Sequence, residues 1–260
     1  MSNISSAFAG GKAFIPFVTC GDPDIETTER LVLAMAEAGA DLIELGVPFS
    51  DPTAEGVVIQ AANLRALQGG MTTDKAFALV ERLRQRTKVP MVFMTYANVV
   101  FSYGIERFCA RAAEVGLDGL ILPDVPFEEK EEFAAPARAC GLDLVSLIAP
   151  TSHDRIRAIA AQAEGFVYCV SSLGVTGVRS EITTDIGAMV ALVKQANPAI
   201  PCAVGFGIST PEQAAAMAAV SDGAIVGSAI VKLCAQYGAD AVPHVADYVC
   251  QMKAAVASVN

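Results

Sequence analysis

Short segments rich in β-branched and aromatic residues alternate with amphipathic helical segments along the whole chain. The strand-like segments are eight in number and begin near Phe14, Leu42, Val89, Gly119, Asp143, Phe166, Pro201 and Gly223. Helical patterns such as 24–39, 104–116, 127–141 and 210–220 lie between them. Two of these four open on Asp or Thr, and three close on Gly. Eight βα units predict a parallel (β/α)8 TIM barrel, with residues 1–260 forming a single domain after a short N-terminal segment.

The interval between the second and third strand segments is longer than the others. It holds two helical patterns, 57–67 and 73–86, so we expect one extra helix there. A doubly wound open sheet is the structural alternative. That fold commonly places a G-x-G-x-x-G sequence after its first strand, and this chain has none, which favours the barrel.

Composition excludes several classes of protein. Hydrophobic residues make up 53% of the chain and charged residues only 18%, which indicates a large buried core rather than a disordered chain. The formal charge of −10, with no run of Lys or Arg, disfavours a nucleic-acid partner. No apolar run reaches the ~18 residues that span a membrane, and the first residues lack a signal-peptide pattern, so we expect a cytoplasmic protein.

Cysteine and histidine usage argues against a metal site. The seven cysteines are widely scattered without C-x-x-C spacing, which is typical of reduced, buried thiols. His153 and His244 are the only histidines, which disfavours an imidazole-rich metal site or a Ser-His-Asp triad. We interpret His153 as a residue in the first turn of a helix that begins after Ser152.

Glu44 is a lone carboxylate within an apolar strand. If 42–48 form one strand, alternation places Leu42, Glu44, Gly46 and Pro48 on one face, and Ile43, Leu45 and Val47 on the other. A buried, unpaired carboxylate has a raised pKa, and Gly46 would leave an open approach to it. The pattern predicts a residue that exchanges protons with a ligand, and a buried ion pair is the alternative.

Glycine clusters follow three neighbouring strand segments, at 171–177, 205–209 and 227–228. In a barrel, the carboxyl ends of the strands form the active-site face, and glycines there let backbone N–H groups approach an anion closely. The clusters predict a phosphate-ester ligand, although ordinary turns are the alternative explanation.

Six segments resemble the α subunit of tryptophan synthase, an indole-3-glycerol-phosphate lyase, and the resemblance covers nearly the whole chain. They are FIPFVT (14–19), LGVPFSDP (45–52), YAN (96–98), GVTG (174–177), GFGIS (205–209) and GSAIVK (227–232). The resemblance implies that this chain carries out a retro-aldol cleavage of indole-3-glycerol phosphate to indole and glyceraldehyde 3-phosphate, a step of tryptophan biosynthesis, without a cofactor of its own.

The resemblance also assigns residues. It makes Glu44 the general acid/base, Glu55 a second carboxylate where members commonly have aspartate, and Tyr168 a supporting catalytic residue. It implies apolar contacts to indole from Phe17, Tyr96 and Phe206. The remaining substrate-binding residues, mostly around the phosphate, are Thr176, Gly177, Gly207, Gly227 and Ser228.

A partner is implied as well. The family's α subunit packs beside a β subunit that uses pyridoxal phosphate, in an α2β2 heterotetramer, and Asp51 and Pro52 lie where that contact is expected. The loops 49–56 and 171–184 are long for a barrel, and the second resembles a mobile lid. In that loop Ser172 stands where members carry arginine.

Three alternatives remain at this stage. The chain could be a freestanding lyase, a non-catalytic activating subunit, or a sugar-phosphate isomerase. The isomerase would need a histidine near the end of a strand, and neither histidine stands there.

Overall fold

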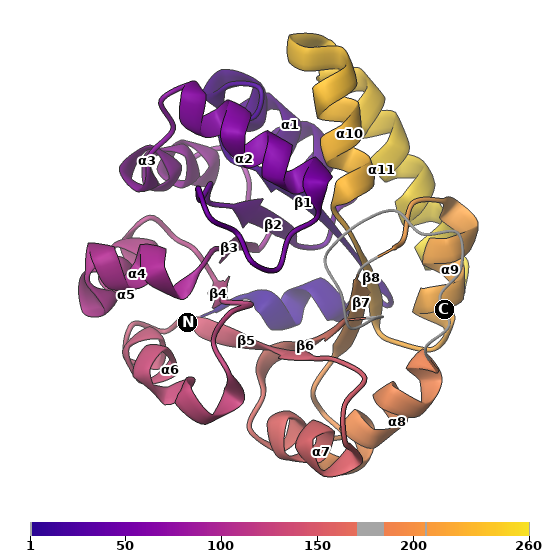
Figure 1. The fold of residues 1–260 in the computed structure, drawn as a ribbon. Coiled ribbons are helices and arrows are strands. Elements are labelled where there is room, and N and C mark those ends of the chain that lie inside the picture. The colour runs from indigo at the N-terminus through magenta and orange to yellow at the C-terminus, as the bar shows by residue number, and fades with distance from the viewer. Residues whose placement is uncertain (1, 171–184, 206, 260) are drawn as a thin grey trace.

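Eight parallel strands close into a barrel in chain order, as predicted, and the helices surround it (Figure 1). The computed structural model describes residues 2–170, 185–205 and 207–259. The strands are β1 (Ala13–Thr19), β2 (Ile43–Gly46), β3 (Met91–Met94), β4 (Gly119–Ile121), β5 (Asp143–Ile148), β6 (Glu164–Val170), β7 (Cys202–Gly205) and β8 (Gly223–Val226). Pairing of β1 with β8 completes the ring, which excludes the open doubly wound sheet.

The helices confirm the extra element between β2 and β3, where both α2 and α3 lie. The α-helices are α1 (Ile25–Glu37), α2 (Val57–Gln68), α3 (Thr73–Arg84), α4 (Ala97–Tyr103), α5 (Ile105–Glu114), α6 (Glu131–Ala139), α7 (His153–Ala161), α8 (Ile186–Ala196), α9 (Pro211–Ala219), α10 (Ser228–Tyr237) and α11 (Ala241–Ala257). Short 3₁₀ helices are η1 (Ile4–Phe8), η2 (Phe127–Glu129) and η3 (Gly238–Asp240). The predicted helix 127–141 is therefore divided into η2 and α6, and α4 is an addition that the sequence pattern did not reveal.

Side-chain caps begin several helices where the sequence predicted. The carboxylate of Asp24 accepts a hydrogen bond from the Thr27 N–H at the start of α1. The Ser152 hydroxyl does the same for α7, so His153 is the first residue of that helix, as predicted. Such caps satisfy N–H groups that lack a partner within the helix, and they fix where it starts.

Alternation along the strands divides the apolar side chains into an inner and an outer layer. The barrel interior holds Ile15, Phe17, Leu42, Val92, Met94, Ile121, Val145, Phe166, Tyr168, Ala203 and Ile225. The layer between strands and helices holds Phe14, Val18, Ile43, Leu45, Val47, Phe93, Leu120 and Ala224, among others. The predicted faces of the Glu44 strand are correct, although β2 itself spans only Ile43–Gly46.

The N-terminal segment covers the lower end of the barrel. In Figure 1 the indigo helix η1 lies behind the strands, and Ile4 belongs to the interior cluster. The Asn3 N–H donates to the Asp118 carboxylate over 2.9 Å, and Arg84 pairs with the same carboxylate. With this end filled, the opposite end, where the strands finish, remains for a ligand.

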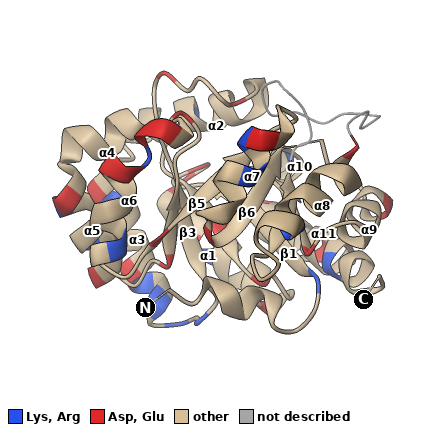
Figure 2. Ribbon diagram, turned by 90° about the horizontal axis from the view of Figure 1, so that it is seen from below, with Lys and Arg blue, Asp and Glu red and all other residues tan. Residues whose placement is uncertain are grey.

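Charged residues lie mainly on the outer helices, and acidic and basic ones are interspersed (Figure 2). Ion pairs such as Arg111 with Glu81 link neighbouring helices. All seven cysteines are free, and five of them are buried, as predicted. Within the described residues, no helix combines the length and apolar character needed to cross a membrane.

Candidate active site

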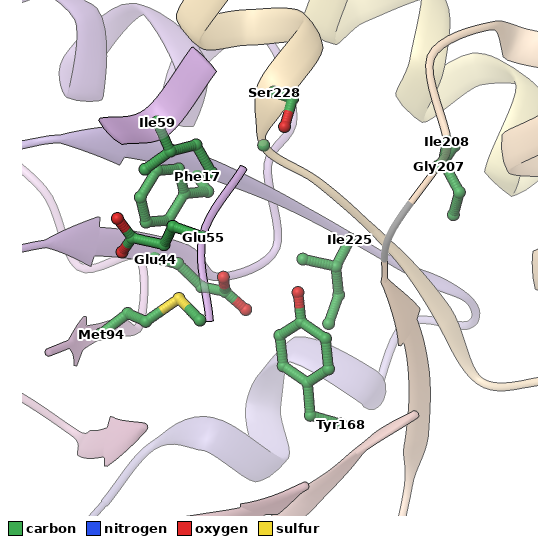
Figure 3. Close-up of a pocket in the computed structure, with 11 residues that line it drawn as sticks. Phe17, Glu44, Glu55, Ile59, Met94, Tyr168, Gly207, Ile208, Ile225 and Ser228 are labelled. Carbon is green, nitrogen blue, oxygen red and sulfur yellow. The ribbon is translucent and has the colours of Figure 1, made fainter. Parts of the chain in front are cut away.

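A cavity opens at the carboxyl ends of the strands. Its lining brings together most of the residues predicted from sequence, contributed by several strands and loops (Figure 3). The lining residues are Phe17, Glu44, Glu55, Ile59, Met94, Tyr168, Gly207, Ile208, Ile225, Gly227 and Ser228.

Glu44 lies at the base of this cavity with only 1% of its surface exposed. It pairs in register with Phe17 of β1 and Val92 of β3, and its Oε1 atom has no hydrogen-bond partner among the described residues. No ion pair to Glu44 occurs among those residues either, which argues against the buried-ion-pair alternative. Burial raises its pKa to about 8, so the carboxyl group is mostly protonated at neutral pH and can donate a proton.

Two glycines make room for the aromatic rings beside Glu44. A Cβ atom at Gly46 would lie 2.6 Å from Cζ of Phe17, so the space that we expected to be an open approach is filled by the Phe17 ring. A Cβ atom at Gly205 would overlap the Tyr168 hydroxyl in the same way. The two glycines therefore allow the rings of Phe17 and Tyr168 to enter the barrel mouth.

Tyr168 projects inward from β6, and its hydroxyl points toward the carboxyl group of Glu44 (Figure 3). Burial, and secondarily the charge of Glu44, hold the pKa of the phenol well above its ordinary value. The hydroxyl thus stays protonated, and it can donate a hydrogen bond to an oxygen that develops charge in the cavity.

Glu55 stands in the loop between β2 and α2 and is 6% exposed. Its Oε2 atom accepts a hydrogen bond of 2.6 Å from Nδ2 of Asn63 in α2. Burial raises its pKa to about 7, and the Asn63 hydrogen bond opposes that rise. Of the two carboxyl groups, Glu44 therefore keeps its proton to higher pH than Glu55 does, which suits one to act as an acid and the other as an ionised acceptor.

Tyr96 is buried but does not line the cavity. Its hydroxyl accepts a hydrogen bond of 3.1 Å from the Ala54 N–H, and its ring packs on Phe49 with centroids 5.3 Å apart. Here Tyr96 holds the loop that leads to Glu55, and its predicted contact to indole stays a prediction.

Asp51 and Pro52 also lie outside the cavity. They line a separate surface groove between their loop and α2, where Val57 is 78% exposed and Leu64 is 57% exposed. Apolar side chains exposed this far are suited to contact a partner protein.

The other end of the cavity is suited to bind an anion. Gly227 and Ser228 lie at the start of α10, whose first helical hydrogen bond runs from the Val231 N–H to the Gly227 carbonyl. The preceding N–H groups of such a helix have no partner within it, and they attract a phosphate. No Lys or Arg occurs among the described lining residues, so here an anion would be held by N–H and hydroxyl groups.

Contacts to Ser209 hold the neighbouring loop after β7, which carries Gly207 and Ile208. The Ser209 N–H donates to Oε1 of Gln213 over 2.8 Å, and the Tyr248 hydroxyl of α11 donates to the Ser209 carbonyl over 2.9 Å. The loop is thereby fixed from both α9 and α11.

Some predicted site residues fall in parts of the chain that the structure does not describe. Thr176, Gly177 and Phe206 lie outside the described residues, as does the predicted lid 171–184 with Ser172. Conversely, the sequence prediction missed Asn63, together with the apolar lining residues Ile59, Met94, Ile208 and Ile225. One signal was available, because Asn63 interrupts the otherwise apolar buried stripe of α2. No cluster of three metal-ligating side chains occurs in the described part of the chain.

Relatives of known identity match this chain over nearly its full length. The family model for the tryptophan synthase alpha chain matches residues 5–259. The tryptophan synthase alpha chain of Lacticaseibacillus casei is 47% identical over 256 residues, which cover 98% of this chain and 96% of that relative. That of Shouchella clausii is 51% identical over 230 residues, which cover 88% of this chain and 85% of that relative.

Solved structures agree in fold. Tryptophan synthase subunit alpha from Legionella pneumophila is 35% identical, with a TM-score of 0.89 and 99% of both chains covered. A chain of the tryptophan synthase α2β2 complex from Pyrococcus furiosus is 35% identical, with a TM-score of 0.86. It matches 94% of this chain and 99% of its own length. That structure was described as the structural basis of the mutual activation of the complex.

Proposed function

This chain belongs to the tryptophan synthase alpha chain family, and from that premise we propose that the cavity cleaves indole-3-glycerol phosphate to indole and glyceraldehyde 3-phosphate. The proposed reaction is a retro-aldol cleavage that makes the protein a carbon–carbon lyase of tryptophan biosynthesis. The observation that carries the proposal is the meeting of Glu44 and Glu55 in one cavity, with pKa values of about 8 and about 7.

Glu44 moves the protons in this proposal. Indole is a poor leaving group as a carbanion, so C3 of the ring must first gain a proton, and the protonated Glu44 carboxyl supplies it. The Glu44 carboxylate so formed then takes the proton of the glycerol hydroxyl next to the bond that breaks. As that C–C bond breaks, its electron pair enters the protonated ring and an aldehyde forms, so Glu44 ends protonated again.

Glu55 acts on the ring nitrogen. Protonation at C3 puts positive charge on the indole N–H, and an ionised carboxylate that accepts a hydrogen bond from this group stabilises the intermediate. Tyr168, turned toward Glu44 from the other side, is proposed to donate to the substrate oxygen near the reacting carbon. Phe17, with Ile59, Met94 and Ile225, offers an apolar surface for the indole ring.

The phosphate is proposed to lie at the opposite end, against Gly207, Gly227 and Ser228. Contacts made equally in substrate and transition state lower KM without raising kcat, unless they also orient the reacting bond. Thr176, Gly177 and Phe206 remain predicted substrate contacts.

We predict that Tyr248→Phe raises KM for indole-3-glycerol phosphate about tenfold and changes kcat little, because the Ser209 carbonyl loses its tether to α11 and the phosphate loop loosens. Steady-state kinetics of this variant would be compared with those of Tyr237→Phe, which removes a hydroxyl at the far end of α10. Equal KM values in the two variants would contradict a role for the tether.

Turnover of indole-3-glycerol phosphate by the purified chain, with and without a β subunit, tests the proposal and separates the alternatives. Formation of indole and glyceraldehyde 3-phosphate in equal amounts is the expected result. Activity that is full without a partner would indicate a freestanding lyase, and no cleavage under either condition would indicate an activating subunit. Isomerisation of triose phosphates without cleavage would favour the isomerase alternative.

A tryptophan synthase β subunit is the expected protein partner, in an α2β2 assembly like that of the Pyrococcus furiosus relative. We propose that it docks on the groove lined by Asp51, Pro52, Val57 and Leu64, whose loop leads directly to Glu55. Pyridoxal phosphate is assigned to that partner, and the steps assigned to this chain use none. A cytoplasmic location accords with the metabolic role proposed.

We predict that adding a β subunit raises the rate of cleavage severalfold in a saturable titration, because docking on the groove would order the loop that carries Glu55. Asp51→Ala should shift the titration to higher β concentration. Asp154→Ala serves as the control, since Asp154 lies exposed on α7, on the other side of the barrel mouth (Figure 1). A flat titration with the unmutated chain would contradict activation by the partner.

A further inference from the structure

We propose that Asn63 is a positioning residue for the lyase reaction, and that its amide holds the Glu55 carboxylate ionised with one oxygen left for the indole N–H. The inference rests on the function proposed above. It concerns a residue of α2 that neither the sequence reading nor the cavity lining singles out.

The first support is the contact itself. Nδ2 of Asn63 donates to Oε2 of Glu55 over 2.6 Å, which is short for an N–H···O bond. Asn63 is 3% exposed and Glu55 is 6% exposed. Because a buried amide or carboxylate without a partner is costly, each of these groups depends on the other.

The second support is that both ends of this contact are fixed. On the helix side, Arg65 makes two hydrogen bonds of 2.8 Å to the buried carboxylate of Asp22, which ties α2 to the loop after β1. On the loop side, Nε2 of Gln60 donates to the Glu55 carbonyl over 2.7 Å. The Asn63 amide therefore meets the carboxylate from a set direction.

The third support is the number of contacts. No other hydrogen bond to the Glu55 carboxylate is present among the described residues, so Oε2 is occupied and Oε1 remains for a ligand. In Figure 3 this carboxylate is turned away from the Tyr168 hydroxyl. The arrangement keeps the acceptor of the ring proton apart from the acid that protonates C3.

The chemical consequence follows from the charge of the acceptor. A hydrogen bond donated to a carboxylate stabilises its charged form, and burial acts in the opposite sense on Glu55. Without the amide, burial alone would keep Glu55 protonated to higher pH. A protonated Glu55 could no longer stabilise the positive charge on the indole nitrogen.

The variant that tests this is Asn63→Leu, which keeps similar volume and removes the donor. We expect kcat/KM at neutral pH to fall roughly tenfold to a hundredfold, as for loss of a hydrogen bond to a charged group. In the pH profile of kcat/KM, the acidic limb of this variant should shift to higher pH by about one unit, because activity needs Glu55 ionised. Asn197→Leu is the matched control, since the Asn197 amide, at the end of α8, donates to the Ala160 carbonyl of α7, away from the cavity.

A second measurement does not depend on turnover. The carboxyl carbons of ¹³C-labelled glutamates would be titrated by NMR in the unmutated chain and in Asn63→Leu, with Glu55→Gln and Glu44→Gln identifying the two signals. We expect the pKa of Glu55 to rise by about one unit in Asn63→Leu and to stay unchanged in Asn197→Leu.

The outcomes are distinct. If the Glu55 titration is the same with and without the Asn63 amide, the inference is overturned, whatever the enzyme does. If that titration shifts but the unmutated chain does not cleave indole-3-glycerol phosphate, the proposed function fails while the link between Asn63 and Glu55 stands. A loss of activity in Asn63→Leu without a shift in either titration or pH profile would indicate a purely structural role and would also overturn the inference.

Discussion

Glu44→Gln is expected to fold normally, to bind substrate and to lose at least ~10²-fold in kcat, because an amide keeps the volume of the side chain but cannot exchange the proton. The loss should be in kcat rather than KM, since Glu44 acts on the bonds that change. Steady-state kinetics on indole-3-glycerol phosphate measure this directly. Glu37→Gln, at the exposed end of α1, is the control.

The same substitution should make the protein more stable at alkaline pH. The pKa of Glu44 is raised from 4.5 to about 8 in the folded chain, so between these values the unfolded chain has released the proton and the folded chain has kept it. The free energy of unfolding of the unmutated protein must therefore fall as pH rises through this range, and then level off above it. The glutamine variant lacks this loss.

Thermal unfolding at about pH 5 and about pH 9 tests this prediction, with the difference in Tm between variant and parent growing toward the higher pH. An inactive variant that is also more stable would show that burial of the carboxylate serves catalysis at the expense of stability. A variant that retains most of its activity would contradict the assignment of Glu44 as the acid. A Tm difference between Glu44→Gln and the unmutated protein that does not change with pH would contradict the raised pKa of Glu44.

Glu55→Ala is expected to lower kcat/KM roughly tenfold to a hundredfold, because the indole N–H loses a charged acceptor and the buried Asn63 amide loses its partner. Glu55→Asp should be milder but not silent. Its carboxylate is about 1.5 Å shorter in reach, which lengthens the hydrogen bonds on both sides. Kinetics of the two variants side by side measure the difference, and an unchanged alanine variant would exclude the proposed role.

The pH profile of the unmutated protein carries the same information. Cleavage needs Glu55 ionised and Glu44 protonated, so kcat/KM should fall below a pH of about 7 and again above a pH of about 8. The falling acidic limb should be absent in Glu55→Ala and present in Glu44→Gln, provided that residual activity is measured. If the acidic limb were instead absent in Glu44→Gln and present in Glu55→Ala, the roles assigned to Glu44 and Glu55 would have to be exchanged.

The sequence alone determined the architecture and the most distinctive site residue. Eight strand patterns predicted the barrel, and the long interval after the second strand predicted its extra helix. Both predictions were possible because hydrophobic periodicity is a local property that can be recognised in short stretches of sequence. The same local rule assigned Glu44 to the inner face of its strand. The helix cap at Ser152 placed His153 in the first turn of a helix. Family resemblance then supplied roles for Glu55 and Tyr168, which the structure brings into one cavity with Glu44.

The contacts around the site and the order of the carboxyl pKa values were decided only by closure of the barrel. The Phe17 ring fills the space at Gly46, and the Tyr96 hydroxyl holds the loop that leads to Glu55. Both contacts depend on neighbours that are remote in the chain. The order of the two carboxyl pKa values likewise comes from unequal burial and from the single amide of Asn63. Desolvation and through-space hydrogen bonds arise only when separate segments meet, so no local pattern in the sequence could show which carboxyl group keeps its proton.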